Sequence, residues 1–422
     1  MKRGPTEDAR VDTDGAERSS SERTAGTVPR PDLLLATGGT GGHIYPALAV
    51  AHEARARGLH VMILGQRRGM EARLAAEAAV PFVGVSAGKW NRQRPDPRQA
   101  WRALKGVFEA VRLVRQARPL RVVGFGGFAS FPGCVGAVLN GIPLILHEGN
   151  AFPSRVNRWF ARRAALVVSA QPEALAHLSG ARDTIVVPFP VREQRVDRNP
   201  ARAALDIPKD AVVTLVMGGS QGSLTLNRAV PEAFRRLGTD APTSATATRP
   251  AHHVLHAAGP ALVHEVRERT KDLANYHVLP YVDAPTAWSA ADLAITRSGV
   301  GTLSEAALHG VPLVMVPLPS SAEDHQLHNA RAVAAAGAGA VVEQHELDHL
   351  AGAWLALLEP DARAAGAAAA RARSPEGAAR RMVDAVLRVG ADQTVGADQT
   401  VGAGAETHRV STSHAQKRTP NP

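Results

Sequence analysis

Residues 37–45 read TGGTGGHIY and directly follow the apolar run 33–36. Four glycines in five residues leave backbone amides uncovered, and a helix that begins near His43 would direct its positive end at the turn. The turn therefore suits an anion or a sugar diphosphate. It lacks the lysine of the nucleoside triphosphate P-loop. His43 can accept a proton from a bound hydroxyl, but it can equally cap the helix, and the local sequence leaves both interpretations open.

Three further polar loops follow apolar runs: GFGGFAS from Gly124, GGSQGS from Gly218 and RSGVGTLSE from Arg297. In the second of these, backbone amides and the Ser220 hydroxyl can hold a phosphate, and the alternative is a tight turn without a ligand. In the third we expect a helix to begin near Thr302, with Glu305 in its first turn. Glu305 would then either accept hydrogen bonds from a ribose diol or form a capping box.

The loop at Gly124 also fits a dinucleotide-binding pattern, because Glu148 lies near the position of the acid that binds a ribose. This pattern is weak and explains one loop of four. A nicotinamide enzyme is therefore disfavoured.

A polar cluster, EDHQLHN at 323–329, opens another predicted helix. His325 and His328 share a helical face, but zinc needs a third ligand that the sequence does not place there. Gln326 and Asn329 share that face and offer amides to several hydroxyls. A sugar ring fits this cluster better than a metal, and we expect no metal and no cofactor.

The chain of 422 residues carries a formal charge of +10, and the excess is concentrated in residues 89–121. There, bulky apolar side chains recur at helical spacing among arginines and lysines. Such a helix suits an anionic membrane surface, while the alternative is an amphipathic helix with a core-facing stripe and solvated charges. A second basic and aromatic cluster at 155–163 favours membrane contact. We expect no nucleic-acid partner.

No apolar stretch reaches the roughly 20 residues that span a bilayer, and the N-terminal segment has no apolar signal core, so we expect a cytoplasmic protein. The single cysteine, Cys134, can form neither an internal disulfide nor a zinc site, and we expect it to be buried.

Short apolar runs alternate with helical patterns in two series, which predicts two doubly wound α/β domains whose loops face each other across a cleft. We predict a disordered tail at 1–29, an N-terminal Rossmann-like domain at 30–193, a linker at 194–210 and a C-terminal Rossmann-like domain at 211–372. A helix at 373–388 would return to the first domain, and 389–422 is a low-complexity tail. Residues 239–252 look like a surface insertion.

Seven motifs in order closely resemble those of the peptidoglycan N-acetylglucosaminyltransferases of glycosyltransferase family 28 type, which convert lipid I into lipid II. The resemblance runs from about residue 33 to 387. Its motifs are TGGTGGH, GFGGF with Ser130 and Pro132, IPLILHE with Asn150, PVR at 190–192, GGSQG, RSG followed by TLSE, and DHQ with Asn329.

The resemblance implies a glycosyltransferase of the B type, bound peripherally at the cytoplasmic face of the membrane. Its partners would be UDP-N-acetylglucosamine, undecaprenyl-linked lipid I and the anionic membrane surface. It implies that His43 is the general base. Implied substrate-binding residues are Thr40, Gly41, Gly42 and Asn150 near the donor sugar, Arg192 and Ser220 at the diphosphate, Val282 at the uracil, Glu305 at the ribose, Val300, Gly301, Thr302, Leu303 and Ser304 in the enclosing turn, and Gln326 and Asn329 at the sugar hydroxyls.

The chain departs from the family pattern at two places. Gly149 stands where members usually have glutamine, and Pro188-Phe189 stands where they have Gly-Asn. Proline removes an amide donor, and phenylalanine replaces an amide side chain with a ring. The alternatives that remain are a UDP-sugar epimerase or hydrolase of the same fold, or a binding module whose catalytic site has decayed.

Overall fold

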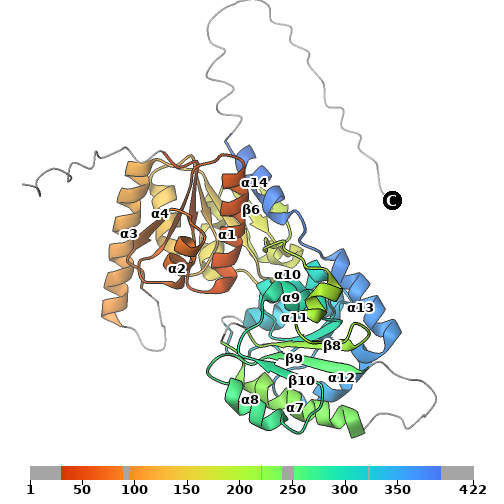
Figure 1. Ribbon diagram of the computed structural model, residues 1–422. Helices are drawn as coiled ribbons and strands as arrows, with labels where there is room; N and C mark the ends of the chain where they lie inside the picture. The colour runs from red at the N-terminus through yellow and green to blue at the C-terminus, as the bar shows by residue number, and fades with distance from the viewer. Residues whose placement is uncertain (1–29, 89–95, 220, 240–250, 322–323, 391–422) are drawn as a thin grey trace, which may run out of the picture. The chain divides into compact units, whose positions relative to one another are not determined.

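A computed structural model describes residues 30–88, 96–219, 221–239, 251–321 and 324–390 (Figure 1). The predicted tails, apart from 389–390, lie outside these residues. So do Ser220 and most of the predicted insertion at 239–252.

The first sheet has seven strands in the order β3-β2-β1-β4-β5-β6-β7, and its strand pairs run parallel. The chain starts at an interior strand, β1, and builds outwards in both directions, as in a doubly wound fold. The strands are β1 Leu33–Ala36, β2 Val61–Gln66, β3 Phe82–Val85, β4 Arg121–Gly124, β5 Leu144–Glu148, β6 Leu166–Ser169 and β7 Thr184–Val186. The helices are α1 Gly41–Ala56, α2 Met70–Glu77, α3 Pro97–Ala117, α4 Phe131–Leu139 and α5 Arg155–Phe160.

The second sheet has six parallel strands in the order β10-β9-β8-β11-β12-β13. Its strands are β8 Val212–Met217, β9 His252–Ala257, β10 Tyr276–Leu279, β11 Leu293–Thr296, β12 Leu313–Met315 and β13 Gly339–Val341. The helices of this half are α6 Arg198–Ala203, α7 Leu224–Thr239, α8 Val263–Thr270, α9 Ala284–Ala290, α10 Val300–His309, α11 His325–Ala335, α12 Leu350–Leu358, α13 Pro360–Ala372 and α14 Ala378–Arg388. The predicted two-sheet α/β fold is confirmed.

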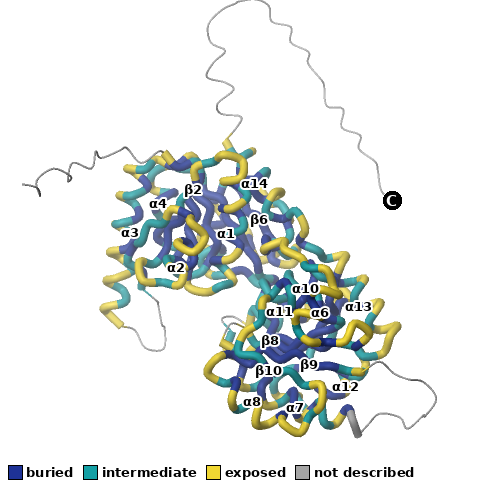
Figure 2. Tube along the Cα trace, viewed as in Figure 1, coloured by how far each residue is buried: buried dark blue, intermediate teal, exposed yellow. Residues whose placement is uncertain are grey.

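Alternate residues of the second sheet pack into two separate cores, which lie on its opposite faces. Figure 2 shows that the strands of this sheet are largely buried. Val213 and Leu215 pack with α9, α10, α11 and α13, whereas Val216 packs with α7 and α12. This is the period of two that side chains have along a strand. The polar Thr214 is accommodated because its hydroxyl accepts a hydrogen bond from the Trp354 indole nitrogen at 3.0 Å. The helices on both faces explain why these strands are almost continuously apolar.

By compactness the chain divides into a first unit of residues 1–147 and 154–160, and a second of residues 148–153 and 161–422. In the first unit the central strand β1 is fully buried along its length. Helix α4 packs on α3, and Cys134 on α4 is buried as predicted. Burial raises the pKa of the Cys134 thiol to about 12.

Helix α3 does not turn its bulky apolar residues towards the core. Its buried residues are the small Gly106 and Ala110 together with Val114, whereas Trp101 and Phe108 are 66% and 70% exposed. Gly106 is required there, because an added Cβ would lie 1.6 Å from the Ser86 carbonyl oxygen. The close approach of the helix therefore uses its small face and leaves its aromatic face in solvent. No helix among the described ranges is long and apolar enough to cross a membrane.

One local prediction needs correction. The helix predicted to begin near Thr302 begins at Val300, with Gly299 as its N-cap, so Glu305 lies beyond its first turn. The segment between β6 and β7 forms a 3₁₀ helix at Pro172–His177. The chain there is short, and a single 3₁₀ stretch connects the two strands.

Candidate active site

In the first unit, the residues from Thr40 to His43 form the start of α1. Thr40 is the N-cap, with extended backbone and no side-chain capping bond, and His43 is the third helical residue. His43 is thus not the helix cap. Its backbone carbonyl accepts a hydrogen bond from the Thr37 hydroxyl at 2.6 Å. The first hydrogen bonds of α1 run from the His43 and Ile44 amides to the Thr40 carbonyl. Gly41 and Gly42 precede them, so their amides provide donors at the positive end of α1.

The glycines of this turn are required by the side chains around them. A Cβ added to Gly38 would lie 2.2 Å from Glu71 Oε1, and one added to Gly39 would lie 2.9 Å from the Phe128 ring. A Cβ on Gly127, in the loop after β4, would lie 2.8 Å from Cδ2 of the His43 ring. The β1–α1 turn and the β4–α4 loop therefore interlock around His43.

Glu71 supports this turn and was not foreseen from the sequence. Its side chain is 1% exposed, and its Oε1 accepts a hydrogen bond from the Gln66 backbone at 2.7 Å. Added Cβ atoms on Gly65 and Gly69 would also collide with its carboxyl group. Three glycines converge on one carboxyl group, but Glu71 itself occupies an ordinary helical position. No sequence signal singles it out.

A second histidine of the first unit, His147 at the end of β5, is buried beside a Phe125 ring at a centroid distance of 5.2 Å. Burial, with a smaller contribution from His43, lowers the pKa of His147 to about 3. The His147 ring is therefore neutral at pH 7. A neutral neighbour leaves His43 free of the repulsion that an imidazolium would impose on a proton acceptor.

In the second unit, Asn150 and Asn329 are brought together. The Asn329 Nδ2 donates to Asn150 Oδ1 at 3.2 Å and to the Ser298 carbonyl at 3.3 Å, while its Oδ1 accepts from the Ala151 amide at 2.9 Å. Glu148 Oε1 accepts from both the backbone and the side chain of Asn150. Asn329 thus joins the loop after β5 to the loop after β11, and the protein itself satisfies its polar atoms.

Gln326 lies one turn before Asn329 on α11. Its Oε1 accepts from the amides of Ser298 at 3.3 Å and Leu318 at 3.1 Å, while its carbonyl accepts from the Ser298 hydroxyl at 2.8 Å. Its side-chain nitrogen donates to none of the described residues, so these two N–H groups remain available to a ligand. Arg297 fixes the same loop through the carbonyls of residues 316 and 317 and the Gln344 side chain.

Glu305 lies in the middle of α10, where its Oε2 accepts a hydrogen bond from the Trp288 indole nitrogen at 3.1 Å. Burial raises the pKa of Glu305, and the Trp288 bond opposes that shift. The sequence allowed Glu305 to form a capping box at the start of this helix. The helix begins five residues before Glu305, at Val300, so Glu305 forms no capping box and contacts Trp288 instead. Trp288 is 1% exposed and was not singled out in the sequence.

The turn before α10 is sterically open. An ideal Cβ on Gly299 meets nothing within 4 Å, and one on Gly301 touches only Phe189, at 4.0 Å. Gly219, in the phosphate-type loop after β8, is also open. Of the remaining predicted residues, Arg192 is exposed in the segment after β7, and Val282 is half-buried after β10. Thr302, Leu303 and Ser304 belong to the first turns of α10.

The two departures from the family pattern fit one another. A Cβ on Gly149 would lie 2.6 Å from the Phe189 ring, which is 3% exposed. The ring packs in an apolar cluster with Val191, Val300 and Leu308. Phe189 thus occupies space that any side chain at position 149 would need. The two substitutions therefore form one coupled change beside the start of α10.

The histidines of α11 do not suggest a metal site. The His328 ring stacks on Phe152 at a centroid distance of 5.4 Å, and Phe152 also contacts His177. Among the residues that the structure describes, no group of three or more His, Cys, Asp or Glu side chains could hold an ion.

Comparison with known families places the chain. The sequence model of the glycosyltransferase family 28 N-terminal domain matches residues 33–169, and that of the family 28 C-terminal domain matches residues 213–382. The chain belongs to glycosyltransferase family 28. It is therefore a glycosyltransferase, and the family membership predicted from its motifs is confirmed.

Relatives with the same printed name align along most of the chain. The name is UDP-N-acetylglucosamine–N-acetylmuramyl-(pentapeptide) pyrophosphoryl-undecaprenol N-acetylglucosamine transferase. The protein from Deinococcus deserti is 48% identical over 374 residues, which cover 84% of this chain and 97% of the relative. The protein from Thermus thermophilus is 44% identical over 354 residues, covering 83% and 98%.

Solved structures agree with this fold. The crystal structure of Acinetobacter baumannii MurG matches with a TM-score of 0.69 and 30% identity, covering 84% of this chain and 99% of that one. The Streptomyces glycosyltransferase SsfS6 matches with a TM-score of 0.57 at 17% identity, which supports the fold alone. The predicted glycosyltransferase B type, with two Rossmann-like domains, is confirmed.

Proposed function

We propose that this enzyme transfers N-acetylglucosamine from UDP-N-acetylglucosamine to the 4-hydroxyl of undecaprenyl-diphospho-N-acetylmuramoyl-pentapeptide, converting lipid I into lipid II in peptidoglycan synthesis. The observation that carries this proposal is the 48% identity to a named relative over 84% of the chain. The polar contacts around Asn329, Gln326 and Glu305 support it, because they gather amide and carboxylate groups suited to sugar hydroxyls.

The domain at 30–193 receives the acceptor, and the domain at 211–372 binds the donor. Arg192 and Ser220 hold the donor diphosphate, Glu305 accepts from the ribose hydroxyls, and the backbone at Val282 meets the uracil. Trp288 orients the Glu305 carboxylate by its hydrogen bond. The Gln326 side-chain nitrogen donates to a hydroxyl of the donor sugar.

The chemistry follows from how charge moves. As the anomeric bond breaks, negative charge grows on UDP, where Arg192 and the amides of the Gly218 loop stabilise it. The acceptor hydroxyl attacks the opposite face of the sugar while His43 removes its proton, so the anomeric configuration inverts. A single displacement needs no covalent nucleophile. The interlocked glycine turns hold the His43 ring in place for this step.

The deciding experiment supplies labelled UDP-N-acetylglucosamine and a short-chain lipid I analogue to the full chain. We expect label in a disaccharide product, with inverted configuration at the anomeric carbon. Release of free labelled sugar alone would indicate a hydrolase, and an epimerised nucleotide sugar would indicate an epimerase. Binding of UDP without any product would indicate a decayed site. Each of these three results would overturn the proposal.

We further propose that the enzyme attaches peripherally to the cytoplasmic face of the membrane through the aromatic face of α3. Trp101, Leu104 and Phe108 are 66%, 62% and 70% exposed and recur at helical spacing. Arg98, Arg102 and Lys105 alternate with them and are exposed. An exposed apolar stripe bordered by cations matches anionic headgroups over an acyl layer. Trp159, which is 72% exposed, lies in the second basic cluster of the same unit.

Vesicle binding tests the attachment. The full chain should bind phosphatidylglycerol-containing vesicles and bind neutral phosphatidylcholine vesicles far less. Salt should weaken the binding, because exposed charges are screened within about 10 Å at 0.1 M ionic strength. Trp101→Ser with Phe108→Ser should reduce binding at least tenfold, whereas Leu224→Ser, at an exposed leucine of the second unit, should not. Salt-independent binding, or equal binding by the double variant, would contradict this attachment.

A further inference from the structure

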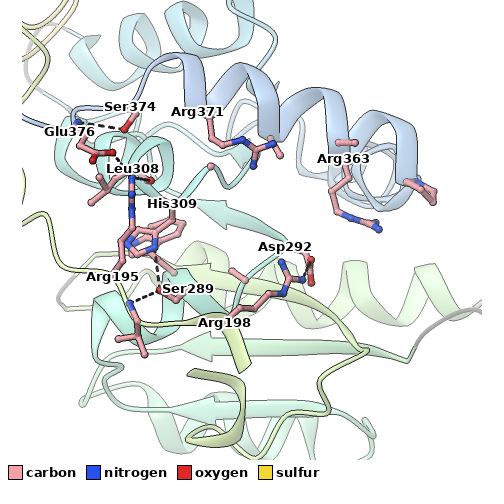
Figure 3. A pocket seen from close by; sticks show the side chains of 17 residues that line it. Arg195, Arg198, Ser289, Asp292, Leu308, His309, Arg363, Arg371, Ser374 and Glu376 are labelled. Atoms are coloured by element: carbon pink, nitrogen blue, oxygen red, sulfur yellow. Dashed lines mark hydrogen bonds and ion pairs between the residues drawn. The ribbon is translucent and has the colours of Figure 1, made fainter. Parts of the chain in front are cut away.

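A cavity of about 700 Å³ lies in the second unit, and none of the residues assigned to the donor is part of its lining (Figure 3). It is bounded by the segment before α6, the end of α9, the end of α10 and one side of α13. This volume is in the range of small-molecule sites, which is about 300–1,000 Å³. Nothing in the proposed transfer reaction uses it.

Arginine dominates the charged lining of this cavity, which we call the α13 pocket. Arg195, Arg198, Arg363 and Arg371 line it, against the carboxylates of Asp292 and Glu376. The lining therefore carries four positive charges and two negative ones. Burial, with a contribution from Arg195, lowers the pKa of His309 in the same lining to about 4, so His309 adds no charge at pH 7.

The two carboxylates are already committed to other groups. Asp292 Oδ2 accepts from Arg202 at 2.7 Å and from the Val213 amide at 2.8 Å, and Asp292 also pairs with Arg198. Glu376 pairs with Arg195 at 3.1 Å. Among the lining residues, four guanidinium groups stand against two carboxylates, so their net charge is +2. The excess belongs mainly to α13.

Of the four arginines in the lining, Arg363 and Arg371 are the two for which no described carboxylate is a partner. Arg363 donates to the Leu358 carbonyl at 2.6 Å, which leaves its charge uncompensated. The stem of Arg371 crosses Gly310, where an added Cβ would lie 2.6 Å from its Cγ. Both side chains extend from α13 towards the cavity (Figure 3). Two uncompensated guanidinium forks facing one cavity suit phosphate oxygens, which they bind in bidentate fashion.

We propose that the α13 pocket is a binding site for a small soluble anion that carries at least two phosphate charges. The guanidinium groups of Arg363 and Arg371 supply the main contacts, and Arg198 lies on the opposite side of the cavity. The apolar residues Leu308, Pro360, Ala364 and Ala367 complete the lining.

The pocket touches α10 at the end opposite to the proposed donor turn. Leu308 and His309, the last two residues of α10, line the pocket, whereas Val300 is the first residue of the same helix. Trp288 also lines the pocket and donates its indole hydrogen bond to Glu305. If the donor assignments of the proposed function hold, an anion in the pocket changes the affinity for UDP-N-acetylglucosamine through this ten-residue helix. The anion site itself does not depend on them.

The test uses inorganic pyrophosphate as the probe and the full chain as the protein. Calorimetric titration should show saturable binding that weakens at least tenfold in the Arg363→Gln, Arg371→Gln double variant. The matched control is Arg182→Gln with Arg388→Gln, which removes two exposed arginines of the second unit outside the pocket. This control should change the affinity less than twofold.

Hydrogen exchange locates the site and separates it from the donor loop. Pyrophosphate should protect peptides of α13 and of residues 306–310, and the double variant should lose that protection. Protection confined to the loop at 217–224, or equal binding by the double variant, would overturn the α13 pocket. Transfer to the lipid I analogue is measured separately. If no transfer is observed, the proposed function is wrong, but the pyrophosphate binding result can still be interpreted.

Discussion

The two units both carry glycine-rich loops after strands, yet the glycines serve different physical purposes. In the first unit, Gly38, Gly39 and Gly127 are required because Glu71, Phe128 and His43 fill the space that a Cβ would need. In the second unit, Gly219 and Gly299 have no neighbour within 4 Å of an added Cβ.

This difference shows that similar motifs position ligands in different ways. The first unit uses glycine to pack its own backbone closely around one histidine. The second unit holds its loops with side-chain hydrogen bonds from Asn329, Gln326 and Arg297, and leaves Gly219 and Gly299 bare. We infer that the bare glycines provide clearance for the donor, whereas those of the first unit maintain the catalytic geometry.

The largest expected effect is on His43. His43→Ala should lower kcat about 10²–10⁴-fold, the usual contribution of a general base, and change the donor KM little. The measurement is steady-state transfer with the lipid I analogue. His52→Ala, at an exposed histidine on the same helix, is the control and should keep the wild-type rate. Wild-type turnover in His43→Ala would show that His43 is not the general base.

Gly38→Ala tests the packing of the first unit and should lower the free energy of unfolding by about 3 kcal/mol, combining backbone strain with overpacking. Gly38 has φ of +142°, and its added Cβ collides with Glu71. Gly58→Ala separates the two causes, because Gly58 also has positive φ, +81°, but meets nothing within 4 Å. We expect about 1 kcal/mol there. Equal losses in denaturant unfolding would show that Glu71 does not constrain the turn.

Acid should weaken both units, because each contains a buried neutral histidine. Burial lowers the pKa of His147 in the first unit and of His256 in the second to about 3 each. Below the ordinary value of about 6.5 the unfolded chain binds a proton that the folded chain does not, so stability is complete above that pH and falls as the pH decreases towards 3.

Between pH 7 and pH 5 each of these histidines should cost about 2 kcal/mol, read from urea unfolding at the two pH values. His147→Gln and His256→Gln should each remove their share of the decline, and exposed His52→Gln should not. An unchanged decline in either variant would show that the histidine concerned is protonated when folded.

Position 149 in the second unit, unlike Gly219 and Gly299, is a glycine that its neighbour does require. Gly149→Ala should cost about 2 kcal/mol, since the Phe189 ring is wedged in its cluster and cannot move aside freely. In a Phe189→Leu background the same change should cost at least 1 kcal/mol less, the coupling expected of residues in contact. Additive costs in urea unfolding would show that the two departures are independent.

The smallest expected effect on stability, within about 0.5 kcal/mol, is that of Gly299→Ala, because φ is −66° and the added Cβ is unobstructed. If the donor approaches this turn, the donor KM should nevertheless rise about tenfold. Gly352→Ala, also unobstructed and far along the chain from this turn, should leave the donor KM unchanged. An unaltered KM in Gly299→Ala would show that clearance is not the reason for glycine at this position.

Much of the fold could be predicted from the sequence, because buried parallel strands are almost continuously apolar and end at glycine or polar residues. The two predicted series of apolar runs and helical patterns correspond to the strands and helices of the two sheets. The start of α10 was placed two residues late, since Thr302 is a better N-cap by type than Gly299. Tertiary contacts decided that boundary.

The contacts that support the candidate site were less predictable. Glu71 and Trp288 lie at ordinary helical positions, and only the fold brings them to Gly38 and to Glu305. The alternation of apolar and basic residues on α3 left two orientations open. The close approach of α3 to Ser86 at Gly106 determines which orientation the helix adopts. The periodicity of the sequence does not predict such an approach.

The isolated thiol of Cys134 has a practical consequence. It is buried and its pKa is raised to about 12, so almost none of it is thiolate at neutral pH, and thiolate is the form that reacts with alkylating dyes. A cysteine introduced at an exposed position would therefore be labelled selectively without removal of the native one. A polarity-sensitive fluorophore attached to a cysteine that replaces Leu104 on α3 would report vesicle docking, with little background signal from labelled Cys134.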